Sequence, residues 1–347
     1  MAARSSALFH LTSCRHTARS DVPRRGFPCP HPGEQMPQPT DSRILHDFLV
    51  IHRWQWPLPV AYLCYAGWGI AYAAPGLDHI PLLATVAVIL ANLFLFASGL
   101  ALNTIADIDT DSRHGDKNYL TKAVFRVGVV RTRRWVTGEI AAGLACAVSS
   151  AFLTGRPLVF VYAVTTAILH WSYNVEPVRL KHRGFPGAIA FGACSAALPC
   201  LTAFTAVAAG AGLPGLPVLL VFLGLGVLSG GRTAWWSVPD AEADAAAGAA
   251  TPTVRHGTRR AVGLSCLIML AGLVLIASGL RALSGPLWAI AGIAPHLLVL
   301  AFAARPLLAT EHGDLLPSSA WLRTRGLPLV TLGEVVLLGV PLAAAAP

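Results

Sequence analysis

Hydrophobic and polar positions alternate along this chain in long blocks. Nine apolar runs of about 20 residues each are separated by shorter polar segments. A helix needs about 20 residues to cross the roughly 30 Å hydrocarbon core of a bilayer, so each run predicts a membrane-spanning helix. The period of two that is typical of a barrel strand is not seen. We expect spans over 57–74, 80–102, 136–155, 157–175, 187–210, 213–231, 261–280, 286–304 and 327–346.

Composition agrees with a membrane protein. The chain is 54% hydrophobic and 12% charged, against about 25% charged residues in soluble domains. The first 43 residues are rich in Arg, Ser, Pro and His and predict a disordered basic segment, which is a start-site artefact if translation begins at Met36. Residues 44–347 are expected to form one nine-helix domain. The 7 cysteines show no metal-ligand spacing.

The positive charges predict an orientation. All Lys and Arg residues except Arg156 and Arg281 fall in the N-terminal segment or in the loops after the second, fourth, sixth and eighth expected spans. Loops enriched in Lys and Arg face the cytoplasm, so the N-terminus is expected there. The excess of Arg over Lys favours a bacterial source and hence a bacterial plasma membrane. This topology explains the net charge of +9, and no basic stripe interleaved with aromatics indicates a nucleic-acid partner.

A first acidic cluster follows the second expected span. If that helix continues past residue 102, Asn103, Asp107 and Asp111 are spaced i, i+4, i+8 and share one face. Asp109 then points to a different surface. A second cluster follows the sixth span, where Asp240 and Asp244 share a face and Glu242 points away.

Like charges four residues apart repel each other, so we expect a cation to hold each pair. Mg²⁺ prefers carboxylate oxygens and is typically shared with substrate phosphates. Lys and Arg also recognise phosphoryl groups, and several occupy nearby segments. Ordinary solvated helix ends and positive-inside topology are the alternative explanation. The cations are Lys117, Lys122, Arg126, Arg179, Lys181 and Arg255.

A few polar or small residues lie inside or beside the expected spans. Glu139 and Glu334 are functional hypotheses without an identifiable partner, because ionisable side chains in membranes usually have a role. His170 is a weaker candidate for a proton acceptor, with hydrogen bonding in the structure as the simpler interpretation. The glycines at 224, 226, 230 and 231 are expected to allow close helix packing rather than to line a tunnel.

Three stretches resemble the UbiA superfamily of intramembrane prenyltransferases. They are the N103-xxx-D107-xxx-D111 run, the loop "YNVEPVRLKHRG" and the segment "DAEADAAAGAATPTVRHG". The resemblance implies nine transmembrane helices around a central cavity. It further implies that Asn103, Asp107, Asp111, Asp240 and Asp244 hold two Mg²⁺ ions.

By the same resemblance, Lys117, Arg179 and Lys181 grip a diphosphate, with Lys122 of the same segment as a further candidate, and Tyr173 faces the reacting allylic carbon. The segment "NYLTKAV" and Trp236 depart from the family pattern, which affects the expected cation contacts and the acceptor more than the metal chemistry.

The resemblance implies Mg²⁺-dependent transfer of a prenyl group from a prenyl diphosphate to an aromatic acceptor, namely a phenol, a hydroxybenzoate or a quinone precursor, with release of diphosphate. A terpene cyclase on the same scaffold, which needs no acceptor, stays open. An ion-coupled transporter is a remote alternative, because transporters place their coupling sites near the bilayer midplane and these acids lie at one membrane face.

Overall fold

The computed structural model describes residues 41–344, apart from 75, 114, 115, 211, 309–315 and 317. Most of the expected N-terminal segment, residues 1–40, therefore lies outside the described residues. The described part is helical and contains no strand, which confirms the predicted all-α fold class. Its first element is α1 (Asp41–Ile51), so helix begins slightly before the predicted domain boundary at residue 44.

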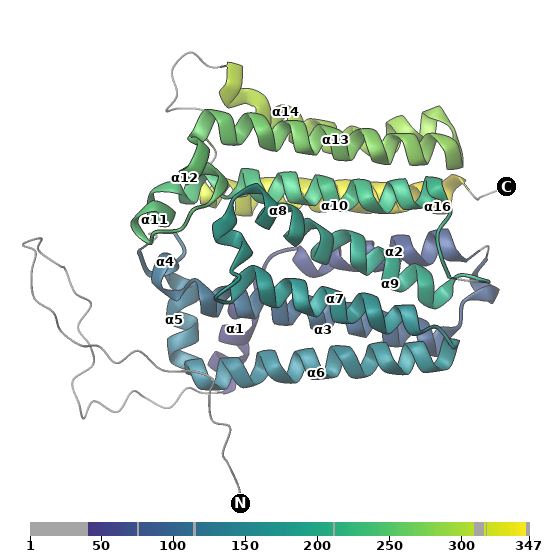
Figure 1. Ribbon diagram of the computed structural model, residues 1–347, viewed down its shortest axis with the longest axis horizontal. Helices are drawn as coiled ribbons and strands as arrows, with labels where there is room; N and C mark the ends of the chain where they lie inside the picture. The colour runs from purple at the N-terminus through teal and green to yellow at the C-terminus, as the bar shows by residue number, and fades with distance from the viewer. Residues whose placement is uncertain are drawn as a thin grey trace, which may run out of the picture. The chain divides into compact units, whose positions relative to one another are not determined.

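The long helices run side by side in a bundle (Figure 1). Each expected span overlaps one of them, and the chain between 185 and 207 is a helix interrupted by the π-helix η3. These elements are α2 (Leu58–Ala73), α3 (Leu82–Ala106), α6 (Val129–Thr154), α7 (Pro157–Asn174), α8 (Phe185–Gly192), η3 (Ala193–Ala197), α9 (Leu198–Val207), α10 (Leu216–Trp236), α13 (Thr258–Ser284), α14 (Pro286–Leu308) and α16 (Leu327–Ala344).

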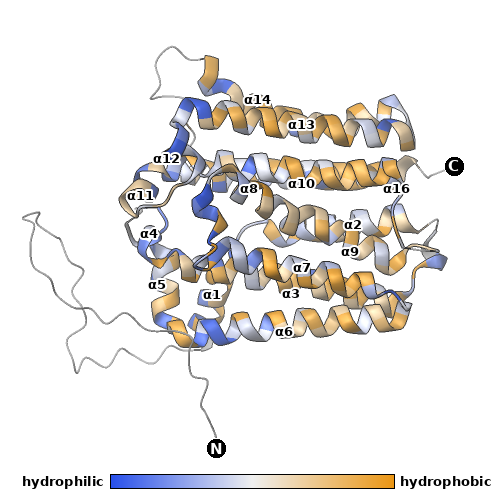
Figure 2. Ribbon diagram, in the orientation of Figure 1, coloured by the Kyte–Doolittle hydropathy of each residue, from blue (hydrophilic) through white to orange (hydrophobic). Residues whose placement is uncertain are grey.

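Short helices connect the long ones. Several of them gather at one end of the bundle, on the left in Figure 1, which we call the polar end because hydrophilic residues concentrate there in Figure 2. The short elements are η1 (Leu77–His79), α4 (Ile108–Arg113), α5 (Asn118–Val127), η2 (Leu180–Arg183), η4 (Val238–Asp240), α11 (Ala241–Ala246), α12 (Pro252–His256), α15 (Ser319–Trp321) and the π-helix η5 (Leu322–Gly326).

Seven stretches of the described chain are long and apolar enough to cross a membrane. The two other expected spans are α2, which has 16 residues, and α7, which has 18 residues and ends in polar side chains. The protein is thus an integral membrane protein, whereas the count of nine spans stays a prediction. Large apolar side chains on the outer surface fit contact with lipid, as Phe152 is 84% and Leu287 is 80% exposed.

Small residues set the spacing of α10 from its neighbours. A Cβ on Gly226 would lie 2.9 Å from the Cβ of Ala197, and one on Gly231 would lie 2.8 Å from the backbone N of Met269 on α13. The facing Gly192 of α8 is tighter still, because its Cβ would lie 2.1 Å from the Gly226 carbonyl oxygen. Since a side chain at these positions would push the helices apart, the prediction that these glycines serve close packing is confirmed.

Candidate active site

The first acidic cluster lies where α3 ends. Asp107 is the C-cap of α3, and the helical spacing carries on into α4 because the backbone N–H of Asp111 donates to the Asp107 carbonyl at 2.7 Å. Asn103, Asp107 and Asp111 consequently line one cavity, while Asp109 is exposed. The predicted orientation of these side chains is confirmed.

The second acidic cluster lies where α10 ends. The chain continues through η4 into α11, which places Asp240 and Asp244 on the wall of the same cavity and leaves Glu242 exposed. Two carboxylate pairs from remote parts of the chain therefore meet at one opening, at the polar end of the bundle. We call this opening, with Asp107, Asp111, Asp240 and Asp244, the acidic mouth.

The cavity beneath the acidic mouth has a volume of about 300 Å³. Aromatic and aliphatic side chains from α2, α3 and α8 form much of its inner wall, where Tyr62 stacks on Phe96 with ring centroids 3.6 Å apart. Tyr173 also lines the cavity, and its ring lies 5.0 Å from that of Phe191. A polar opening thus leads into an apolar, aromatic interior, an arrangement suited to an amphiphilic ligand with an anionic head.

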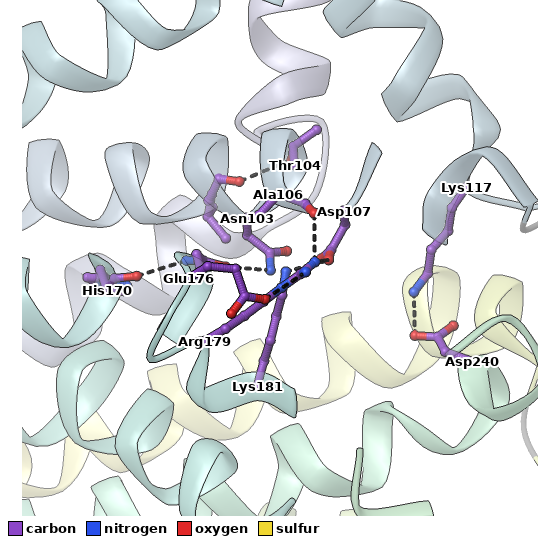
Figure 3. A network of polar contacts seen from close by, with 12 residues as sticks. Asn103, Thr104, Ala106, Asp107, Lys117, His170, Glu176, Arg179, Lys181 and Asp240 are labelled. Carbon is purple, nitrogen blue, oxygen red and sulfur yellow. Dashed lines mark hydrogen bonds and ion pairs between the residues drawn. The ribbon is translucent and has the colours of Figure 1, made fainter. Parts of the chain in front are cut away.

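Two lysines neutralise the acidic mouth. Lys117, the N-cap of α5, pairs with Asp240, and Lys181 of η2 pairs with Asp107 (Figure 3). Each pair connects segments that are distant along the chain. Both lysines line the cavity as predicted, and in this structure their partners are carboxylates.

Asp107 and Asp111 of the acidic mouth differ in their electrostatic surroundings. Burial alone would raise the pKa of Asp107, but the ion pair with Lys181 outweighs it and lowers that pKa. Burial, together with the nearby Asp107 carboxylate, raises the pKa of Asp111 from 3.8 to about 6. The Asp111 Oδ2 atom is buried and has no hydrogen-bond partner among the described residues. A cation beside Asp111 would therefore stabilise its charged form.

The amide of Asn103 is held from two sides. Its Oδ1 accepts a hydrogen bond from Arg53 Nη2 at 2.8 Å, and its Nδ2 donates to Asn174 Oδ1 at 2.9 Å. Arg179 lies beside this cluster without lining the cavity. Its Nη2 donates to the carbonyl oxygen of Ala106 at 2.9 Å and lies 3.9 Å from Asp107 Oδ1 (Figure 3). Arg179 thus supports the end of α3.

Three other expected cations lie away from the cavity. Lys122 is exposed because α5 turns the face with Leu120, Ala123 and Val124 toward the core. Lys122 was predicted at the diphosphate site, but helix periodicity places it on the exposed face of α5 and it does not line the cavity. Arg126 pairs with Asp47 of α1 at 2.5 Å. The Arg255 side chain donates to the carbonyl oxygens of Ala250 and His182.

The structure also adds residues that the sequence argument missed. Arg53 and Arg323 line the cavity, and the Ser319 hydroxyl donates to Asp240 Oδ1 at 3.3 Å. Little in the sequence indicated these residues. Positive-inside topology already accounts for Arg53 and Arg323, and a single serine in a polar segment such as Ser319 does not stand out. Arg53 also has a left-handed backbone with φ of 55°, and such strain is found at functional sites.

The ionisable residues inside the spans have partners. Glu139 Oε1 and His52 Nε2 are hydrogen-bonded at 2.8 Å. Glu334 lies 2.7 Å from Nη1 of Arg232. The prediction that the sixth span ends at residue 231 was wrong. Helix α10 continues to Trp236, so Arg232 is buried in a helix and does not lie in a loop. The His170 ring packs near the Cys194 sulfur at 3.6 Å and does not line the cavity.

A helical membrane bundle with paired carboxylates and lysines at the mouth of an aromatic-lined cavity defines an intramembrane enzyme class that handles amphiphilic anions. A family model described as the UbiA prenyltransferase family matches residues 62–322. The chain belongs to this family, as the resemblance predicted, and is a prenyltransferase.

Solved structures share the fold. A UbiA homologue from Archaeoglobus fulgidus bound to GPP and Mg²⁺ superimposes with a TM-score of 0.61 at 19% identity, covering 86% of this chain and 99% of that chain. A digeranylgeranylglyceryl phosphate synthase gives a TM-score of 0.58 at 15% identity, covering 87% and 98%. The apo structure of a UbiA homologue from Aeropyrum pernix K1 gives 0.52 at 19%, covering 87% and 96%. A search of curated protein sequences gave no match.

Proposed function

We propose that this prenyltransferase uses Mg²⁺ to transfer a prenyl group from a prenyl diphosphate to an aromatic acceptor, with release of diphosphate. One observation carries the proposal: Asp107 and Asp240, on segments remote in sequence, line the same cavity mouth and are each paired with a lysine. The similar structure from Archaeoglobus fulgidus, which contains GPP and Mg²⁺, supports the same use of the fold.

The acidic mouth fits Mg²⁺. Among the described residues, no three His, Cys, Asp or Glu side chains are close enough to hold a metal by themselves. Mg²⁺ typically takes only one or two carboxylates and completes its shell with water and substrate phosphate oxygens. The unpartnered Oδ2 of buried Asp111 is suited to such an ion. We assign Asp107 and Asp111 to one Mg²⁺ and Asp240 and Asp244 to a second, with Asn103 as an additional oxygen ligand.

The chain's own residues then have distinct roles. Bound Mg²⁺ would neutralise negative charge that develops on the diphosphate leaving group. Lys117 and Lys181 lie beside the carboxylates that would hold Mg²⁺, and their ammonium groups would donate hydrogen bonds to the diphosphate oxygens. The aromatic wall with Tyr62, Phe96 and Tyr173 holds the prenyl chain, stabilises the allylic cation through its ring faces and excludes water.

Transfer and cyclisation differ in what happens to the allylic cation. In transfer, an electron-rich ring of the acceptor attacks it, whereas in a cyclase the substrate's own double bonds do so. The cavity wall carries polar groups below the mouth, with Arg232, Ser195 and Ser229, and a hydrocarbon-forming cavity has no use for these donors. This favours transfer to a polar acceptor.

The test is product analysis. The purified protein is incubated with prenyl diphosphates of several chain lengths, with and without phenols, hydroxybenzoates and quinone precursors, in Mg²⁺ or in EDTA, and products are identified by mass. Transfer predicts a prenylated acceptor only when acceptor and Mg²⁺ are both present. Release of diphosphate with a hydrocarbon product in the absence of acceptor would instead show a cyclase.

A further inference from the structure

A second polar cluster lies on the wall of the cavity, deeper than the acidic mouth. Tyr65 of α2, Ser195 of η3, and Ser229 and Arg232 of α10 all line the cavity. Arg232 stands four positions before the end of α10, which corresponds to about 6 Å at 1.5 Å per residue. It is only 3% exposed. A guanidinium at this depth is unusual and calls for a physical reason.

Arg232 is held by an acidic residue on another helix. Its Nη1 lies 2.7 Å from Oε1 of Glu334 on α16, which is completely buried. The Tyr65 hydroxyl donates to the same Oε1 at 3.4 Å, and His296 Nε2 lies 3.9 Å from Oε2. Burying such a pair generally adds little stability compared with apolar side chains of similar size. Stability therefore does not account for the pair.

One donor of Arg232 remains available. The Nη2 group is buried and has no hydrogen-bond partner among the described residues. An unpartnered buried donor is unfavourable, and a ligand oxygen in the cavity would satisfy it. The neighbouring Ser195 and Ser229 hydroxyls lie 3.3 Å from each other and are also within the cavity wall, so the site offers several polar contacts to one ligand.

The chemistry of the two substrates decides which of them supplies this oxygen. The diphosphate is held at the mouth by Lys117 and Lys181, and the prenyl chain is a hydrocarbon, so the oxygen belongs to the acceptor. Glu334 already neutralises Arg232. A carboxylate would therefore find no net positive charge to offset the cost of burying it in this interior, whereas a neutral hydroxyl or carbonyl oxygen carries a much smaller cost.

We propose that Arg232, positioned by Glu334, selects the acceptor by donating from Nη2 to a neutral hydroxyl or carbonyl oxygen of that molecule inside the cavity. This inference rests on the proposed prenyl transfer. It names the acceptor class as uncharged phenols, quinols or related carbonyl compounds, in preference to aromatic carboxylates.

The experiment separates acceptor binding from donor binding. The Arg232→Leu/Glu334→Leu double variant removes both charges, so that neither is left buried alone. Arg232→Lys is a second variant that keeps the charge and loses the planar fork. Arg156→Leu is the matched control, since that arginine, between α6 and α7, bonds the Thr205 carbonyl at 2.6 Å and does not line the cavity. The KM for hydroquinone and the Mg²⁺-dependent Kd for geranyl diphosphate are measured for each protein.

The expected result is a KM for hydroquinone that rises at least tenfold in both Arg232 variants, with a Kd for geranyl diphosphate within twofold of wild type and no change in Arg156→Leu. An unchanged KM, or an equal loss of geranyl diphosphate binding, would overturn the assignment of Arg232. If the double variant does not fold, Arg232→Lys alone decides.

Acceptor charge is tested with the wild-type protein. Hydroquinone should be used with a higher kcat/KM than 4-hydroxybenzoate, and the reverse order would overturn the preference for a neutral oxygen. Failure of the proposed prenyl transfer can be told apart from failure of the Arg232 inference, because in the first case the wild-type protein would form no prenylated product with any acceptor.

Discussion

Lys117 and Asp240 form an ion pair across the acidic mouth, although 123 residues separate them along the chain. Lys181 and Asp107 form a second such pair, with a separation of 74 residues. In each pair the lysine ammonium neutralises a carboxylate that we assign to Mg²⁺. Under the proposed function, these carboxylates would hold Mg²⁺ and the two lysines would instead contact the diphosphate.

The orientation of the acidic residues gives the first prediction. Asp107→Asn and Asp240→Asn should each reduce Mg²⁺-dependent turnover in membranes at least a hundredfold, because each removes a metal ligand. Asp109→Asn and Glu242→Gln, on the exposed sides of the same segments, should stay within threefold of wild type. Turnover is measured as diphosphate release. The opposite pattern would show that the assigned faces are not the ones that bind metal.

The lysines give the second prediction. Lys117→Met and Lys181→Met should raise the KM for a prenyl diphosphate at least tenfold, because each removes a donor to the diphosphate. Lys122→Met is the matched control, since Lys122 is exposed on α5 and does not line the cavity. Equal effects of all three substitutions would indicate a general influence of positive charge and not specific contacts.

Lys181→Met also removes the ammonium that pairs with the Asp107 carboxylate and leaves it only the more distant Arg179, 3.9 Å away. Removing one member of a buried pair destabilises a protein by about 3–5 kcal/mol. Mg²⁺ should restore part of that stability by taking the place of the ammonium. Thermal unfolding in detergent should therefore show a larger upward shift on addition of Mg²⁺ for Lys181→Met than for wild type. A smaller shift would contradict metal binding at Asp107.

The pKa of Asp111 gives a pH dependence. Its value of about 6 lies above the ordinary 3.8, so in the metal-free protein this carboxyl is charged above pH 6 and neutral below it. Since Mg²⁺ binds the charged form, affinity should be constant above about pH 7 and fall by up to tenfold per pH unit below pH 6. Competition of Mg²⁺ with Mn²⁺, followed by electron paramagnetic resonance, measures it. An affinity that is unchanged at pH 5 would remove Asp111 from the metal site.

The packing of α8 on α10 gives a stability prediction. Gly192→Ala would place a Cβ 2.1 Å from the Gly226 carbonyl oxygen and should destabilise the bundle by about 1–3 kcal/mol through overpacking. Gly138→Ala on α6 is the control, because nothing lies within 4 Å of its Cβ. It should stabilise the protein by about 0.5–1 kcal/mol through helix propensity. Thermal unfolding of both variants checks the difference in sign.

Much of the architecture follows from hydropathy alone. Repeated runs of about 20 residues that are apolar on all sides indicate helices buried in lipid, and a helix has a fixed periodicity, so the spans and the outward orientation of Asp109 and Glu242 were predictable. The ends of the helices were harder to predict, because polar residues begin before a helix ends. For this reason Arg232 was expected in a loop although it lies inside α10.

Partners between distant segments were not predictable. The Arg232–Glu334 pair and the contact of Arg53 with Asn103 depend on how helices far apart in sequence are arranged. The charge of a loop residue also has two explanations, since topology and ligand binding both favour Lys and Arg. Lys122 and Lys181 carry the same charge in segments that the sequence predicts on the same side of the membrane, and the fold shows that only Lys181 of the two lines the cavity.

The most direct test of the shared metal–diphosphate site is calorimetric binding of an unreactive prenyl thiolodiphosphate in the presence of Mg²⁺. Wild type, Asp107→Asn, Asp240→Asn and the double variant are compared. If one diphosphate spans both acidic clusters, each single substitution should weaken Mg²⁺-dependent binding at least tenfold, and the double variant should lose less than the sum of the two effects. Normal binding by either single variant would contradict the account.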